Sequence, residues 1–237
     1  MEKNFTTRTR LIIGDMGDEI LKNSNVIVFG VGGVGSFAAE AIARAGVGNL
    51  TIVDFDDVDI TNINRQLPAL HSTVGKYKVE VMKERILDIN PNINIKALKE
   101  MYTKENSDEI LSGNYDYVVD AIDMVTSKIH LIESCTKRKM KIISSMGMGN
   151  KVDPTKIEVS TIEKTSICPL ARVVRKEMKD RRIKKLKVVY STETPKEVTT
   201  RIMNGNKITP GSISFVPSVA GLTIASVVIN DLLISKK

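Results

Sequence analysis

Three glycines that could bind a phosphate follow a short apolar segment near the N-terminus, with the spacing Gly30-x-Gly32-x-x-Gly35. This spacing gives a strand a tight exit, brings backbone N–H groups close to a phosphate and lets the next helix pack on the sheet. The N-terminus of that helix also attracts an anion through its free N–H groups and its dipole. We therefore predict a nucleotide-binding turn that includes Gly33. The glycines alone fit ATP as well as a nicotinamide or flavin dinucleotide.

Polar and charged residues that could complete such a site come after the glycines. Asp54 follows the next apolar segment, 19 residues after Gly35, close to the position at which a dinucleotide-binding fold places an acid on the ribose hydroxyls. Asp123 ends a later predicted strand, where parallel sheets place their ligands. The remaining candidates are Asp56, Asn62, Arg65, Gln66 and Lys78.

The predicted elements alternate between strands and helices. We expect strands over residues 25–29, 50–54, 93–98, 115–122 and 141–145, with helices over 36–45, 78–89, 103–111 and 127–139. This order predicts an α/β fold, a Rossmann-like and mostly parallel sheet with helices on both faces. A less regular C-terminal part follows, with strands at 157–162 and 186–190, a helix at 169–182, a polar loop at 192–212 and a final apolar helix beginning at Pro217. We expect residues 1–237 to form a single domain.

Composition limits the class of protein. Hydrophobic residues make up 42% and charged residues 27% of the 237 residues, as in ordinary globular proteins. The polar N-terminus and the absence of a long uncharged apolar segment predict a cytoplasmic protein without a membrane span. The only cysteines and histidines are Cys135, Cys168, His71 and His130, which lack the spacing of a zinc site, so no zinc is expected.

The ordered set of motifs resembles the ubiquitin-activating-enzyme-like (ThiF-type) adenylating family over essentially the whole chain. The motifs are the glycine turn, Asp54-x-Asp56, Thr61-Asn62-x-Asn64-Arg65-Gln66, Val74-Gly75-x-x-Lys78 and Asp120-Ala121-Ile122-Asp123. Within that family, the segments at 54–58, 89–91, 120–123, 164–166 and 189–193 look most like the branch that dehydrates threonylcarbamoyladenosine beside the anticodon of tRNA. The resemblance implies ATP and Mg²⁺ as cofactors, tRNA as substrate and a homodimer.

The same resemblance assigns roles to the candidate residues. Transfer of AMP to a carboxylate gathers negative charge on the α-phosphate, which calls for fixed cations and a metal ion. Arg65 and Lys78 would bind phosphate, Asn62 would bind ribose or phosphate, and Asp123 would hold Mg²⁺. Arg10, with Arg8 as a rival, would reach the nucleotide of the partner subunit. Taken singly, Arg65 and Lys78 could be solvated helix charges, Asn62 a helix cap and Arg10 a surface residue.

A run of basic residues near the C-terminal end of the chain is the expected contact for tRNA. Residues 172–187 contain nine cations and two acids, a surplus equal to the net charge of +7 of the whole chain. Such a run is otherwise a solvated helix face. The predicted nucleic-acid contacts are Arg172, Arg175, Lys176, Lys179, Arg181 and Arg182.

Other functions remain as alternatives. The nearest is an adenylating enzyme for the C-terminus of a small ubiquitin-like sulfur-carrier protein, and sulfur-transfer proteins are candidate partners. The missing zinc cysteines and the basic run weigh against this alternative. A regulatory nucleotide-binding module or a nicotinamide oxidoreductase would not need the set Arg65, Lys78 and Asp123.

Overall fold

The computed structural model describes residues 3–200, 203–204 and 207–235. Its helices are α1 (Thr7–Lys22), α2 (Gly35–Ala45), α3 (Lys78–Ile89), α4 (Ser107–Ile110), α5 (Val125–Lys137), α6 (Pro169–Asp180) and α7 (Phe215–Ser235). Its strands are β1 (Asn25–Phe29), β2 (Asn49–Val53), β3 (Asn94–Leu98), β4 (Tyr117–Asp120), β5 (Ile142–Ser145), β6 (Ile157–Thr161), β7 (Lys187–Ser191), β8 (Met203–Asn204) and β9 (Lys207–Ile208).

Seven strands form one sheet in the order β3-β2-β1-β4-β5-β7-β6. All neighbours are parallel except the edge strand β6, which pairs antiparallel with β7. The strand order reverses between β1 and β4, because the chain moves outward from β1 to β3 and then crosses back to β4. A crevice forms outside the carboxyl ends of the strands at such a reversal, and open α/β sheets bind ligands there. The expected mostly parallel α/β fold is confirmed.

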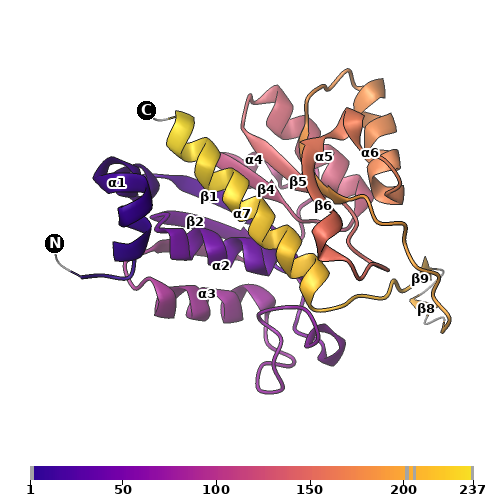
Figure 1. Ribbon diagram of the computed structural model, residues 1–237, viewed down its shortest axis with the longest axis horizontal. Helices are drawn as coiled ribbons and strands as arrows, with labels where there is room; N and C mark the ends of the chain where they lie inside the picture. The colour runs from indigo at the N-terminus through magenta and orange to yellow at the C-terminus, as the bar shows by residue number, and fades with distance from the viewer. Residues whose placement is uncertain (1–2, 201–202, 205–206, 236–237) are drawn as a thin grey trace.

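Helices cover both faces of the sheet, since alternate side chains of each strand point to opposite faces. Val26 and Val28 of β1 join a core with residues of α1, α2, α3 and α7. Ile27 and Phe29 of the same strand join a second core with residues of α4 and α5. A third core lies between α5, α6 and β7. In Figure 1, α7 crosses in front of the sheet on the same side as α1 and α2.

The last helix is apolar because it packs across this core. Val216, Ala220, Ile224, Val228 and Leu232 are buried at the helical spacing of one face. By length and composition α7 also meets the criteria for a membrane span, as core helices often do. Its packing against α2, α1 and the strands favours the core interpretation made from the sequence.

A few boundaries differ from those expected. The helix predicted over 103–111 is confined to Ser107–Ile110, because Thr103 and Asn106 form a turn in which the Thr103 N–H donates to Asn106 Oδ1. The final helix begins at Phe215, two residues before Pro217, whose missing N–H still lies among the unpaired donors of the first turn. The expected loop at 192–212 contains the short antiparallel pair β8 and β9.

Candidate active site

A cavity of about 390 Å³ opens at the reversal point of the sheet. Its walls come from the ends of β1, β2 and β5 and from the segments that follow them, including Phe29, Val53 and Ser145. The segments after β4 and before α7 complete it, with Ala121 and Pro217 among the lining residues. Ten of the predicted site residues line this cavity: Gly30, Gly32, Gly33, Asp54, Asp56, Asn62, Arg65, Gln66, Lys78 and Asp123.

The glycine turn forms one wall of the cavity. Gly30 has a φ of +82°, and a Cβ there would lie 2.7 Å from the Ala121 carbonyl oxygen of the neighbouring turn. A Cβ on Gly35 would lie only 1.7 Å from the Gly30 carbonyl oxygen, far inside any allowed contact. Gly35 is not among the lining residues, so in this structure it allows α2 to pack closely on the turn while Gly30, Gly32 and Gly33 face the cavity.

Asp54 connects the end of β2 to the glycine turn. Its Oδ2 accepts the Val31 N–H at 2.7 Å and its Oδ1 accepts the Asp56 N–H at 2.9 Å. Burial raises the pKa of this carboxyl, although the two backbone hydrogen bonds and the charge of Lys78 act in the opposite direction. Asp54 therefore fixes the shape of the turn and presents its remaining lone pairs to the cavity.

Lys78 and Asp56 form an ion pair at the rim of the cavity, with Nζ 2.6 Å from Oδ2. The Lys78 side chain is 6% exposed, whereas that of Asp56 is 47% exposed. Lys78 is the first residue of α3, and its backbone N–H donates to the Asp56 carbonyl oxygen at 3.1 Å. The charge of Lys78 is thus held in place before any ligand arrives.

A short 3-10 helix, η1 (Ile60–Asn62), positions the polar residues that follow it. Asn62 completes a capping box with Asp59 by accepting the Asp59 N–H at 3.2 Å. Arg65 donates from Nη1 to the Thr61 carbonyl oxygen at 2.8 Å, and burial lowers the pKa of its guanidinium. The Oε1 of Gln66 is buried without a hydrogen-bond partner among the described residues. Gln66 therefore offers an unsatisfied acceptor at the cavity.

Asp123 lies in the segment after β4 and is exposed at the cavity. Its carboxylate makes no hydrogen bond or ion pair with the described residues, so it is available for a cation from solution. Within residues 3–200, 203–204 and 207–235, no group of three or more His, Cys, Asp or Glu side chains could hold a metal ion. A metal ion at Asp123 would take its other ligands from water and phosphate.

Lys128 is a residue that the sequence interpretation missed. Lys128 and Asp120 are fully buried, and Lys128 Nζ donates to Asp120 Oδ2 at 2.6 Å, to Ser144 Oγ at 3.2 Å and to the Ser145 carbonyl oxygen at 3.0 Å. This pair joins α5 to the ends of β4 and β5 next to the cavity. The signal was present, because Lys128 lies three, four and seven residues before Leu131, Ile132 and Cys135 on the buried face of α5.

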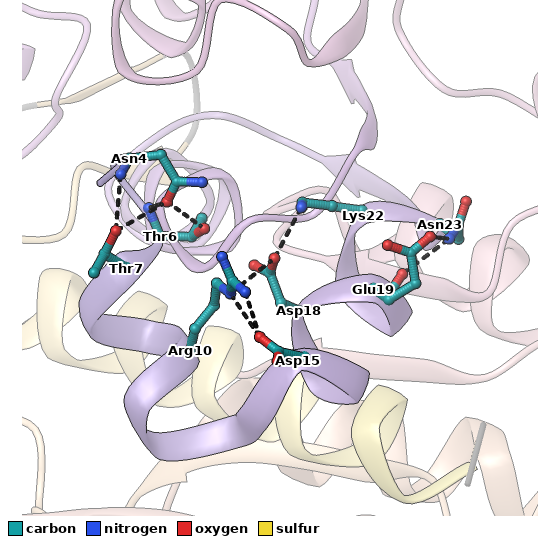
Figure 2. A network of polar contacts seen from close by, with 9 residues as sticks. All are labelled: Asn4, Thr6, Thr7, Arg10, Asp15, Asp18, Glu19, Lys22 and Asn23. Atoms are coloured by element: carbon teal, nitrogen blue, oxygen red, sulfur yellow. Dashed lines mark hydrogen bonds and ion pairs between the residues drawn. The ribbon is translucent and has the colours of Figure 1, made fainter. Parts of the chain in front are cut away.

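Arg10 lies outside the cavity lining. Helix α1 breaks at Gly14, which has φ +73° and ψ +176°, so that Arg10 reaches across the break to two acids. Figure 2 shows its guanidinium between Asp15 and Asp18, with Nε 3.1 Å from Asp15 Oδ1 and 3.6 Å from Asp18 Oδ2. The rival Arg8 is exposed. The expectation that Arg10 acts on a partner subunit stays a prediction.

The predicted tRNA contacts lie on and after α6, and they divide into two groups. Arg175 donates to the Thr165 carbonyl oxygen and to Thr165 Oγ1, at 2.5 and 2.7 Å, and Arg181 pairs with Glu133 and Glu177. The other four, which are exposed and have no such partner among the described residues, are Arg172, Lys176, Lys179 and Arg182. The structure leaves these four free to contact an anion.

Comparison with known proteins agrees with the geometry. The model of the ThiF family matches residues 6–235. The tRNA threonylcarbamoyladenosine dehydratase of Bacillus subtilis (strain 168) is 50% identical over 238 residues, which cover 96% of this chain and 94% of that protein. A structure of Escherichia coli tRNA N6-threonylcarbamoyladenosine dehydratase in complex with ATP matches with a TM-score of 0.89 and 34% identity, covering 97% of this chain and 93% of that chain.

A relative with another activity shares less of the chain. The molybdopterin-synthase adenylyltransferase of Haemophilus influenzae is 38% identical over 128 residues, which cover 54% of this chain and 52% of that protein. The similarity to the dehydratase thus extends over nearly the whole chain, whereas the similarity to the adenylyltransferase covers about half of it. The chain belongs to the ThiF family.

Proposed function

We propose that this protein is an ATP-dependent enzyme that dehydrates threonylcarbamoyladenosine next to the anticodon of tRNA. The observation that carries the proposal is the meeting of the glycine turn, two cations and a free carboxylate around one cavity. The relatives named above support it, since the 50% identity to a dehydratase extends over 96% of the chain.

The first step is adenylation of the threonyl carboxylate. A carboxylate oxygen attacks the α-phosphorus of ATP. The bond between this phosphorus and the oxygen that bridges the α- and β-phosphates breaks, and pyrophosphate leaves. Arg65 and Lys78 bind the phosphates and offset the charge that gathers on them. The planar guanidinium of Arg65 suits two phosphate oxygens, whereas Lys78 acts as a point charge. Asp54 binds the ribose hydroxyls, and Asn62 and Gln66 supply neutral hydrogen-bonding groups.

Mg²⁺ fits this site through the chemistry of Asp123. Mg²⁺ in nucleotide sites takes one or two protein carboxylates and completes its coordination with water and phosphate, and Asp123 is an unpaired carboxylate on the cavity wall. When bound, the ion would neutralise charge on the phosphate oxygens.

The second step closes a ring. A carbamoyl nitrogen or oxygen of the same side chain attacks the acyl carbon, AMP leaves with one carboxylate oxygen, and the carbamoyl group loses an N–H proton. The net change is loss of one water from the modified adenosine. Because the nucleophile and the activated carbonyl belong to one side chain, their proximity supplies much of the acceleration. No cysteine nucleophile is required, and Cys168 is buried, with Sγ 3.9 Å from the Gly147 carbonyl oxygen.

We propose that tRNA contacts the exposed cations of α6. Arg172, Lys176 and Lys179 are spaced by four and three residues, which places them on one face of the helix. Leu170, at the start of the same helix, lines the cavity. A phosphate chain that leaves the cavity can therefore continue along this face.

We also propose a cytoplasmic homodimer in which residues 1–237 act as one adenylation domain. Leu11, Ile12 and Met16 of α1 are 74%, 87% and 70% exposed, so this helix presents apolar side chains without a partner in the described chain. Burying them in a dimer would remove this surface from water. Arg10 directly precedes Leu11 on this helix and would have to exchange Asp15 and Asp18 for a phosphate of the partner's nucleotide.

The deciding experiment is incubation of the protein with ATP, Mg²⁺ and tRNA that carries threonylcarbamoyladenosine. We expect AMP, pyrophosphate and a nucleoside lighter by one water in mass analysis. Release of AMP without a dehydrated nucleoside would refute the tRNA assignment, and release of neither product would refute adenylation. Arg65→Ala and Asp123→Ala should each abolish turnover while the circular dichroism spectrum stays unchanged.

The alternative substrate is a small carrier protein that ends in diglycine. The match to a molybdopterin-synthase adenylyltransferase supports this alternative, but it covers only 54% of the chain. Formation of AMP–carrier adenylate from such a protein, with no reaction on tRNA, would decide for the alternative and would make a sulfur-transfer protein the expected partner.

A further inference from the structure

Besides the cavity, the protein has a groove of about 510 Å³. It lies on the side of the sheet where the parallel strands begin, whereas the cavity lies on the side where they end. It is formed where β4, β5 and β7 begin and where α5, α6 and α7 end, with Tyr117, Ile142 and Ile183 among its lining residues. Five lysines line it, and we call it the lysine groove: Lys139, Lys141, Lys184, Lys185 and Lys187.

The lysines of the groove outnumber the acids that lie close to them. Asp231, the only acid that lines it among the described residues, already accepts hydrogen bonds from Lys187 Nζ at 2.5 Å and from the Tyr117 hydroxyl at 2.7 Å. Burial alone would raise the pKa of Asp231, but these hydrogen bonds hold it below its usual value, so this acid stays ionised. Lys139, Lys141, Lys184 and Lys185 are exposed, and their ammonium groups form no ion pair within 4 Å in the described chain. Glu163, which does not line the groove, accepts the backbone N–H of Lys185 at 2.6 Å, and the charge of Lys184 helps to lower its pKa.

Two lysines of the groove and the nearby Arg182 have a backbone conformation that favours glycine. Lys139, Arg182 and Lys185 have φ values of +57°, +58° and +60°. Lys139 and Arg182 occupy equivalent positions just after α5 and α6, where the next N–H donates back to Cys135 and Met178. Glycine is the usual residue at such a position, because a Cβ makes the left-handed conformation less favourable. The dipole at each helix end favours a cation, but Lys185 follows no helix and has the same conformation.

Helix α6 runs from the cavity, at the carboxyl ends of the strands, to the lysine groove, at their amino ends. Leu170 at its start lines the cavity, and Ile183 just after its end lines the lysine groove. Its 12 residues span about 18 Å at 1.5 Å per residue. The exposed cations Arg172, Lys176 and Lys179 lie along this helix, which also carries Glu177 and Asp180, so its cations outnumber its acids between the cavity and the lysine groove.

We infer that the lysine groove binds the phosphate backbone of tRNA at a distance from the nucleotide that reacts. The inference rests on the proposed function and adds to it a second contact, made by α5 and the starts of β5 and β7. RNA is favoured over an acidic protein or a lipid surface, because only a long polyanion would use the groove and the α6 face together. Aromatic side chains other than Tyr117 are missing among the lining residues, which fits binding of phosphate and not of bases.

The test compares two double variants that remove equal charge. Lys141→Gln/Lys184→Gln removes two cations of the lysine groove, and Lys83→Gln/Lys96→Gln removes two from α3 and β3. Affinity for full-length tRNA is measured by fluorescence anisotropy over a range of salt concentrations. Each lost phosphate contact lowers the slope of log K against log salt by about 0.7–0.9. We therefore expect the groove variant to lose about 1.4–1.8 from the slope and about 10- to 30-fold in affinity at physiological salt, with the control unchanged.

A short substrate separates this site from the cavity. A trinucleotide centred on the modified adenosine cannot reach the lysine groove, so wild type and groove variant should bind it equally. The groove variant should also dehydrate saturating tRNA at the wild-type rate. An unchanged salt slope would overturn the inference while the wild-type reaction stands. Failure of the wild type to dehydrate tRNA would instead refute the proposed function. Vesicles with anionic lipid form a further arm: loss of vesicle binding with unaltered tRNA binding would also overturn the inference.

Discussion

The buried pair of Lys128 and Asp120 gives the sharpest test of how this fold supports its site. Both side chains are fully buried, and Asp120 also accepts the hydroxyl of Ser144 and the N–H of Ile122. Replacing Lys128 with Met keeps a side chain of similar length but removes the charge and its three hydrogen bonds. Asp120 then keeps a negative charge in the core without a counter-ion.

Removing one partner of such a pair costs about 3–5 kcal/mol, so we expect Lys128→Met to lower the free energy of unfolding by this amount. Lys137→Met is the matched control, because Lys137 lies on the same helix and pairs with Glu133, but its side chain is 73% exposed. An exposed pair contributes less than about 1 kcal/mol. The assay is urea unfolding followed by circular dichroism.

A second measurement tests the link to the site. Asp120 holds the N–H of Ile122 at 3.1 Å and so shapes the turn that brings Ala121 against Gly30 and Asp123 to the cavity. Lys128→Met should therefore weaken ATP binding in calorimetry under conditions in which the protein is still folded. Adding Asp120→Asn should recover part of the lost stability, because the uncompensated charge is gone. Equal losses for Lys128→Met and Lys137→Met would refute the reasoning.

Three further predictions concern the turn, the thiols and pH. Gly35→Ala should lower the melting temperature, because its Cβ would lie 1.7 Å from the Gly30 carbonyl oxygen. Gly32→Ala should keep the fold, because the nearest atom to its Cβ would lie 3.6 Å away, but it should abolish the ATP-induced rise in melting temperature. Neither thiol should react with Ellman's reagent at pH 8 before unfolding, because both are buried and burial raises the pKa of Cys135 to about 12; rapid labelling of the native protein would contradict this. The pKa of Asp231 is held low in the folded state, so its stabilising effect is present at neutral pH and is lost as the pH falls through that folded pKa. Asp231→Asn should lower the free energy of unfolding by about 1 kcal/mol at pH 7 and by less at pH 3, a small effect because the side chain is about a quarter exposed.

Local patterns were sufficient to predict most of the fold. The strand ending at Phe29, the glycine turn and the helix ending at Ala45 each follow from residues within one element or its cap. The shortened helix α4 differs because Asn106 accepts a backbone N–H from Thr103 and stabilises a turn in its place. Competition of this kind between a side chain and the helix leaves no trace in hydrophobic periodicity.

The site residues that directly follow strands were predictable, because the carboxyl ends of parallel strands lie on the same side of a sheet. Asp54 and Asp123 follow strands and therefore meet at one edge, whatever the details of packing. The partners of Arg10 were not predictable, because they depend on the break at Gly14, which turns the chain so that Asp15 and Asp18 face back toward it. Which cations of the basic run are paired and which are free was also not predictable. Arg175 and Arg181 contact Thr165 and Glu133, which belong to other segments of the chain.

The same alignment of strands also accounts for the lysine groove. A residue just after a parallel strand lies at the carboxyl edge of the sheet, and a residue just before one lies at the opposite edge. Asp54, Asp56 and Asp123 follow β2 and β4, whereas Lys141 precedes β5 and Lys184 and Lys185 precede β7. The order of residues relative to the strands therefore places these three acids on the side of the cavity and these three lysines on the opposite side. An anionic substrate that extends from one side of the sheet to the other would meet the cavity at one end and the lysine groove at the other. That is the arrangement a tRNA would need if a single nucleotide enters the cavity while the rest of the molecule stays outside.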